Sequence, residues 1–237
     1  MLAFRQVPMA AGAEATCQRC AAPEAHAVTD AAGMDSRLGE ALPVEADAGL
    51  FFTDTGSLDL DGLVRLAGEA ARSGASRIAL RTSGRPVRDI QAAHALLQGG
   101  VRVLEVVFLG PGPEQHDALA GAPGGFDAAA DAIAFVSEAA AALGVRVALR
   151  GRIPVCRHNL HDAPATVTRL AELGVSSMVL ACDPELDVRR SAEWVAAACD
   201  TGTVNRVWVA VSGMPEPALG DKGLHAVDVV SFVEALS

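Results

Sequence analysis

The sequence predicts an α/β fold, a partial (β/α)6-type barrel in which a mostly parallel sheet is covered by helices. From Gly49 onward, short runs of β-branched and apolar residues alternate with segments of helical periodicity. The strand-like runs are almost continuously apolar, as expected for strands that are buried on both faces of a parallel sheet. Glycines follow several helical segments, for example Gly74, Gly144 and Gly174, where helices commonly end. Together these observations favour repeated strand–helix units.

The expected elements follow this alternation from one end of the chain to the other. The expected strands are Ala3–Met9, Leu50–Thr53, Arg77–Thr82, Val103–Leu109, Val145–Val155, Ser177–Cys182 and Val207–Val211. The expected helices are Leu60–Ser73, Val87–Leu97, Asp127–Leu143, Ala163–Leu173, Ser191–Cys199 and His225–Leu236. About seven strands are fewer than the eight of a closed barrel, so an open or partial barrel fits better, with a doubly wound sheet as the alternative.

A length of 237 residues favours a single domain over residues 1–237. We divide it into an N-terminal strand and loop (1–48), an α/β core (49–211) and a C-terminal loop and helix (212–237). No long flexible linker interrupts the alternation.

Composition excludes several classes of protein. The formal net charge is −10 and Lys222 is the one lysine, so we expect no nucleic-acid partner. No uncharged stretch is long enough for a membrane span, and the N-terminus lacks the pattern of a signal peptide. Five cysteines, an odd number, do not suggest a disulfide framework, so thiols or metal ligands are expected. These features predict a cytoplasmic protein with small-molecule or protein partners.

Polar residues follow the predicted strands, and the carboxyl ends of parallel strands meet at one edge of a sheet. We expect ligand contacts there from Asp54, Thr55, Gly56, Ser57, Thr82, Ser83, His158 and Asn159. Turn formation and helix capping are the structural alternatives for the residues that follow the second strand. For Thr82, Ser83, His158 and Asn159, the structural alternative is that their hydrogen bonds order the strand ends and the loops that follow.

Three segments resemble radical S-adenosylmethionine (SAM) enzymes. Arg77-Ile-Ala-Leu-Arg-Thr-Ser-Gly-Arg85 is similar to their strand ending in Thr-Asn-Gly. His116-Asp-Ala-Leu-Ala-Gly-Ala-Pro-Gly-Gly-Phe126 is similar to the loop that opens their next helix. Arg152-Ile-Pro-Val-Cys-Arg-His-Asn-Leu160 is similar to the asparagine loop beyond it, and the order holds over about residues 49–183.

The resemblance implies two further motifs upstream, and both are incomplete. The family holds a [4Fe–4S] cluster with Cys-x3-Cys-x2-Cys, whereas this chain has Cys17 and Cys20 with Ala13 at the first position. The family's Gly-Gly-Glu-Pro motif is replaced by residues 54–57, Asp-Thr-Gly-Ser. Cys17 and Cys20 are therefore the candidate metal ligands, and His158 and Asn159 correspond to positions that reach the adenosine of SAM.

The resemblance implies a degenerate radical-SAM-like protein without catalysis, with no cofactor or a vestigial one. It would act as an accessory subunit of a protein partner, such as an intact radical SAM enzyme or a maturation system. One alternative is an active enzyme with an unusual ligand set, a [4Fe–4S] cluster and SAM. Another is a zinc enzyme that adds two ligands to Cys17 and Cys20, drawn from Cys156, His158, His161 and Cys182. We expect His116, Asp117 and His94 to be structural.

Overall fold

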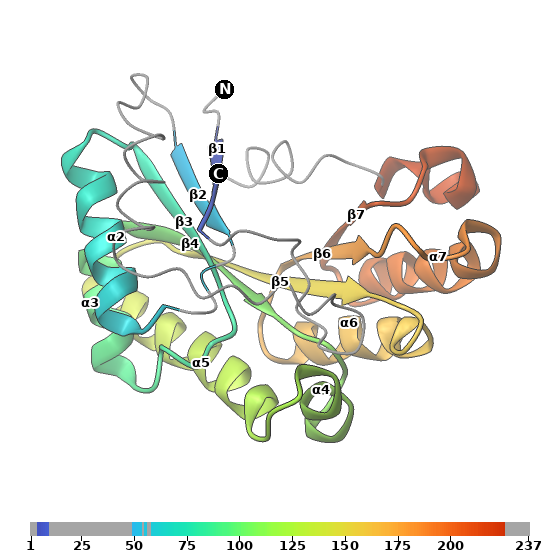
Figure 1. The fold of residues 1–237 in the computed structure, drawn as a ribbon, viewed down its shortest axis with the longest axis horizontal. Helices are drawn as coiled ribbons and strands as arrows, with labels where there is room; N and C mark the ends of the chain where they lie inside the picture. The colour runs from blue at the N-terminus through green and yellow to red at the C-terminus, as the bar shows by residue number, and fades with distance from the viewer. Residues whose placement is uncertain (1–3, 10–48, 54, 56–57, 226–237) are drawn as a thin grey trace.

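The computed structural model describes residues 4–9, 49–53, 55 and 58–225. Within them, one parallel sheet has its seven strands in chain order (Figure 1). The strands are β1 (Phe4–Pro8), β2 (Gly49–Thr53), β3 (Arg77–Thr82), β4 (Val101–Val107), β5 (Ala148–Val155), β6 (Ser177–Cys182) and β7 (Trp208–Ser212). Each strand pairs with the next, so every described connection from β2 onward is a crossover between neighbouring strands.

The helices fill these crossovers and cover one face of the sheet (Figure 1). They are α2 (Leu60–Arg72), α3 (Ile90–Gln98), α4 (Pro113–Ala120), α5 (Gly125–Leu143), α6 (Ala163–Glu172) and α7 (Val188–Val204). Two 3-10 segments complete the described chain, η3 (Leu160–Asp162) and η4 (Glu216–His225). No described helix is long and apolar enough to cross a membrane.

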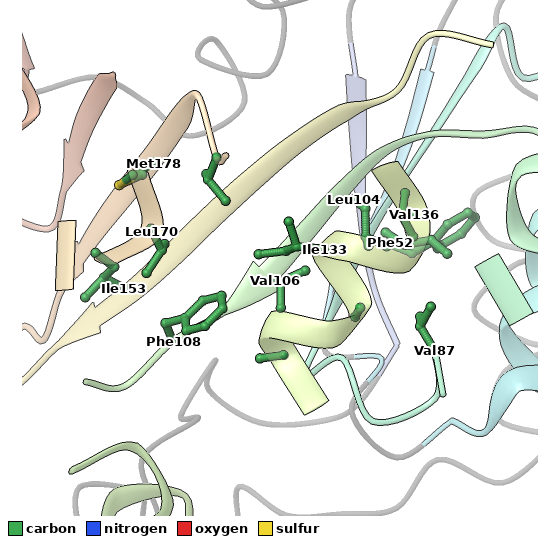
Figure 2. Packing of buried hydrophobic residues seen from close by; sticks show 14 of the residues in the cluster. Phe52, Val87, Leu104, Val106, Phe108, Ile133, Val136, Ile153, Leu170 and Met178 are labelled. Atoms are coloured by element: carbon green, nitrogen blue, oxygen red, sulfur yellow. The ribbon is translucent and has the colours of Figure 1, made fainter. Parts of the chain in front are cut away.

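The main hydrophobic core lies between the helices and the sheet. Leu104 and Val106 of β4 are buried with Ile133 and Val136 of α5 in one cluster. Figure 2 shows these side chains between the α5 ribbon and the strands. Farther along the sheet, Leu170 of α6 belongs to the same cluster. Because side chains of a strand alternate between faces, the residues between these core positions face away from the helices.

Aspartates begin several of the helices. Asp59 accepts a hydrogen bond from Gly62 N (2.9 Å), and Asp89 accepts one from Ala92 N (2.8 Å). Asp187 accepts hydrogen bonds from Arg189 N (3.0 Å) and Arg190 N (3.1 Å) in the first turn of α7. These bonds satisfy amide groups that have no partner within the helix, and so they fix where the helices start.

The predicted fold class, a partial barrel with a parallel sheet covered by helices, is confirmed. The elements differ in detail. Helix α4 was not predicted, because Gly110-Pro-Gly-Pro113 suggested a loop; Pro113 instead occupies the first turn, where its missing N–H costs nothing. Helix α7 extends to Val204, well beyond the predicted end at Cys199. The predicted helix beyond His225 and most of segment 1–48 lie outside the described residues, and the division into domains stays a prediction.

Gly213 gives a test of the packing between the ends of β6 and β7. Its φ is +77°, and an added Cβ would lie 2.3 Å from the carbonyl oxygen of Cys182. Gly74 has a similar φ of +91°, but nothing lies within 4 Å of its Cβ position. We expect Gly74→Ala to lower the free energy of unfolding by about 1 kcal/mol, the cost of the left-handed conformation. Gly213→Ala should cost at least about 2 kcal/mol more, because the backbone must move. Urea denaturation measures both, and equal losses would contradict the close packing.

Candidate functional site

The face of the sheet opposite the helices, here called the inner face, carries a different set of side chains. Leu80 and Leu104 belong to the core under the helices, so their neighbours Arg81 and Glu105 face the other way. A smaller apolar cluster of Phe4, Phe51, Ala79 and Val103 lies on this inner face. The cluster lies next to Arg81 and Glu105, nearer the amino-terminal ends of the strands.

Three charged residues form a row across the inner face. Arg81 of β3 is in register with Glu105 of β4, which is in register with Arg150 of β5. Arg81 Nε donates to Glu105 Oε1 at 2.7 Å, and Arg150 Nη2 lies 3.1 Å from Glu105 Oε2. The guanidinium of Arg81 also stands over the ring of Phe51, at 5.2 Å from its centroid.

Arg152 lies two residues farther along β5, on the same face and nearer the carboxyl end. Four charged side chains are at most 4% exposed: Arg81, Glu105, Arg150 and Arg152. Every other described Arg, Lys, Asp or Glu residue is more exposed. Three guanidinium groups and one carboxylate thus gather in the part of the sheet where water is excluded. Arg81, Arg150 and Arg152 each take part in further interactions, and all three act electrostatically on Glu105.

The arginines control the charge of Glu105. Burial alone would raise the pKa of this carboxyl, but Arg81, Arg150 and Arg152 outweigh burial and hold the pKa below its usual value. Burial also lowers the pKa of Arg150, against the opposing effect of Glu105. The arrangement is therefore an ion-pair network and not a protonated carboxylic acid near neutral pH.

Two of the predicted site residues stabilise the ends of β2 and β3. The hydroxyl of Thr55 donates to the carbonyl oxygen of Arg81. Thr82 Oγ1 accepts from Gly84 N at 3.2 Å. Thr55 and Thr82 are buried and Ser83 is half-buried. Their proposed ligand contacts stay predictions, as do those of Asp54, Gly56 and Ser57, which lie outside the described residues.

Asn159 joins the ends of β4 and β5. Its Oδ1 accepts from Cys156 N (2.8 Å), and its Nδ2 donates to Leu109 O (3.0 Å) and Pro154 O (2.7 Å). These bonds use both amide hydrogens, so the side chain orders the loop and retains only acceptor capacity at Oδ1. His158 is exposed and accepts from Arg157 Nε at 3.2 Å. A ligand contact of Asn159 or His158 stays a prediction.

His116 completes the end of β4. Its Nδ1 accepts from Leu109 N at 3.2 Å, and its ring makes edge contacts with Phe108 and Phe126. Burial lowers the pKa of His116 to about 4, with a smaller opposing effect of Asp117. The Asp117 carboxylate accepts from Gly124 N and Phe126 N, and these amide donors outweigh burial to lower its pKa. The pair connects α4 to the start of α5.

No metal centre is evident in the part of the chain that the structure describes. No three His, Cys, Asp or Glu side chains in it are grouped so as to hold a metal ion. Cys182 and Cys199 are buried under the helices, and burial raises the pKa of each thiol to about 12. Cys17 and Cys20 lie outside the described residues, so their role as metal ligands stays a prediction.

Solved structures of other proteins are similar in fold to this chain. No protein-family model and no curated protein matches it. Among solved structures, a candidate phosphonomutase from Burkholderia cenocepacia J2315 is similar with a TM-score of 0.51 and 14% identity, covering 79% of this chain and 80% of that chain. A candidate lyase/mutase from the same organism has a TM-score of 0.50 and 15% identity, covering 90% of this chain and 68% of that chain. At such identities the likeness establishes the fold alone.

These similarities correct the family resemblance. The radical SAM assignment is wrong, because the chain resembles phosphonomutase and lyase/mutase structures over most of its length. The hypothesis of a degenerate radical-SAM-like accessory subunit falls with it, as does the alternative of an active iron–sulfur enzyme that cleaves SAM. The zinc-enzyme alternative is corrected as well, since its described candidates form no ligand group. The motifs misled because side chains within them order loops of this chain: Asn159 and His116 bind backbone groups.

The inner-face charges were not identified from the sequence. A signal was present, because Arg81, Glu105, Arg150 and Arg152 interrupt otherwise apolar strands at alternate positions. A charge inside a buried parallel strand is costly unless it is paired, and such a charge therefore suggests a partner on a neighbouring strand.

Glu105→Gln tests the network directly. The variant leaves buried guanidinium groups without the carboxylate that holds them, so we expect a loss of about 3–5 kcal/mol in the free energy of unfolding. Glu69→Gln is the matched control, because Glu69 is paired with Arg65 at 3.7 Å on a partly exposed face of α2. It should cost less than about 1 kcal/mol. Urea denaturation at neutral pH measures both losses, and similar values for the two variants would contradict the account.

His116 predicts a dependence of stability on pH. Its folded-state pKa of about 4 lies below the ordinary value of 6.5, so the unfolded chain binds the proton more readily. Its contribution, up to about 3 kcal/mol, is fully present above pH 6.5 and is lost as the pH falls toward 4. We expect His116→Asn to reduce the stability difference between pH 7 and pH 4.5 in urea denaturation. The exposed-residue control His158→Gln should keep the wild-type difference, and an unchanged difference in His116→Asn would refute the assignment.

Proposed function

We propose that the protein binds and acts on a small organic anion, carrying a phosphonate or carboxylate group, at the inner face of its partial barrel. The observation that carries the proposal is the gathering of Arg81, Arg150 and Arg152 around the single carboxylate of Glu105. Guanidinium groups present planar pairs of N–H donors that match carboxylate and phosphonate oxygens. The arginines lie where water is excluded, and there an ionic interaction is stronger than at the surface.

The fold supports the same location. In parallel α/β barrels, ligands bind at the carboxyl ends of the strands. Arg152 lies in the carboxyl-terminal half of β5, and β5 occupies a central place in the sheet. The two similar solved structures are named as a phosphonomutase and a lyase/mutase. We therefore propose lyase or mutase chemistry on such an anion.

The net charge of the chain bears on how the anion is held. At −10 the protein as a whole repels anions. A bound anion must then be held by local groups, and the inner-face arginines are the buried cations of the described chain. Several earlier expectations stay predictions beside this proposal: a protein partner, the absence of a cofactor or its vestigial form, and a cytoplasmic location.

A ligand series tests the proposal. Isothermal titration calorimetry measures the binding of four anions: methylphosphonate, phosphonoacetate, pyruvate and oxalate. The midpoint of thermal unfolding is measured with the same anions. We expect at least one anion to raise the midpoint in proportion to the logarithm of its concentration, as binding to the folded state requires. Acetamide, which is neutral, and sodium chloride at matched ionic strength are the controls. If no anion exceeds the chloride control, the proposed function is wrong.

A further inference from the structure

We propose that the end of α7 and the start of β7, residues Val204–Trp208, form a docking surface for an acidic protein partner that also contributes an apolar side chain. The surface lies at the amino-terminal end of the sheet, whereas ligands of parallel barrels bind at the carboxyl end. It is therefore separate from the site of the proposed function. Three observations carry the proposal: exposed apolar side chains, an arginine in an unusual conformation, and the charge of this end of the molecule.

The exposed large apolar side chains of the described residues all lie at the amino-terminal end. Val204 is 81% exposed, Trp208 is 70% exposed and Leu143 is 36% exposed. Val204 and Leu143 end the helices α7 and α5, and Trp208 begins β7. In Figure 1, α7 and β7 lie on the side of the molecule opposite α2 and α3. Tryptophan and arginine are enriched among the residues that dominate binding at protein interfaces.

Arg206 lies between Val204 and Trp208 in a conformation that favours glycine. Each other described α-helix is followed, within two residues, by a glycine with positive φ: Gly74, Gly100, Gly121, Gly144 and Gly174. After α7 this place is taken by Arg206, with a φ of +58°, the one described residue other than glycine with a positive φ. A side chain in this conformation lowers stability. The turn itself would therefore be better served by glycine, and the arginine calls for a role of its side chain.

The amino-terminal end is basic, although the chain as a whole carries a net charge of −10. Each described turn from the end of a helix to the next strand carries at least one arginine. These arginines are Arg72, Arg77, Arg102, Arg146, Arg169 and Arg206. The glutamates of the same turns are already paired, Glu69 with Arg65 at 3.7 Å and Glu172 with Arg169 at 3.0 Å. Carboxylates from outside the chain would complement this end.

Charge and apolar area together select the occupant. A symmetric pair of copies would bring arginines against arginines, and like charges oppose association. The carboxyl end of a second copy offers acidic first turns, as at Asp61 and Asp127, but no exposed large apolar side chain among its described residues. Membrane-surface binding typically uses the apolar face of an amphipathic helix, whereas Val204 and Trp208 stand at a helix end and a strand start. A different protein, with carboxylates beside an apolar side chain, matches this surface.

Photo-crosslinking identifies the occupant. Benzoylphenylalanine replaces Trp208 in one variant and Arg189 in the control, and each variant is illuminated in cells of the natural host. Arg189 is exposed at the other end of α7. A protein crosslinked from position 208 is identified by mass spectrometry and purified. Isothermal titration calorimetry then measures its affinity for the wild type and for Arg206→Gly, Trp208→Ala and Arg189→Gln.

We expect an acidic protein to be crosslinked from position 208 and not from position 189. Arg206→Gly and Trp208→Ala should each weaken its binding by about 10–100-fold, and Arg189→Gln should bind like the wild type. Arg206→Gly should at the same time raise the urea midpoint of unfolding, because glycine suits a positive φ. A residue that served only the fold would not combine stronger folding with weaker binding.

Four results overturn the inference, and none of them bears on the proposed function. The first is no crosslinking from position 208 above the control. The second is crosslinking between copies of this chain alone. The third is a captured protein whose affinity stays within about threefold of the wild-type value in both Arg206→Gly and Trp208→Ala. The fourth is binding to phosphatidylglycerol vesicles that is lost in Trp208→Ala, which would assign the surface to lipid.

Discussion

The rest of the structure depends on one buried carboxylate. Glu105 is fully buried in the middle of a parallel sheet, and it is stable there as an anion because Arg81 and Arg150 flank it in register. This pairing aligns β3, β4 and β5, since a slip by one residue would turn the charges into the apolar core under the helices. The same ion pairs therefore align the strands and set the charge of the inner face.

Hydrogen bonds at the strand ends hold the carboxyl edge above this network. Asn159 donates a hydrogen bond to the carbonyl oxygen of Leu109, and His116 accepts one from the amide of Leu109. Both backbone polar groups of this residue, just after β4, are therefore satisfied. Asn159 also reaches the backbone of Pro154 on β5. These bonds order the carboxyl ends of β4 and β5, the edge at which ligands bind in parallel barrels.

The alternation of apolar strands and periodic helices was enough to predict a partial barrel, because each strand had to be covered. The site was harder to predict. Which charges pair depends on strand register, and a parallel sheet sets register between residues far apart in the chain, as with Glu105 and Arg150. The short motifs around His116 and Asn159 gave a misleading family assignment, since their side chains order loops by binding backbone. Helix α4 was missed because Pro113 is equally suited to a loop and to a first helical turn.

The central claim is that a small organic anion is held on the inner face by arginine. A crystal structure determined with phosphonoacetate present tests it most directly. The account predicts difference density on the inner face, with phosphonate or carboxylate oxygens within about 3 Å of a guanidinium of Arg81, Arg150 or Arg152. Density confined to surface arginines such as Arg157, or an inner face filled by the protein's own side chains, would contradict the account.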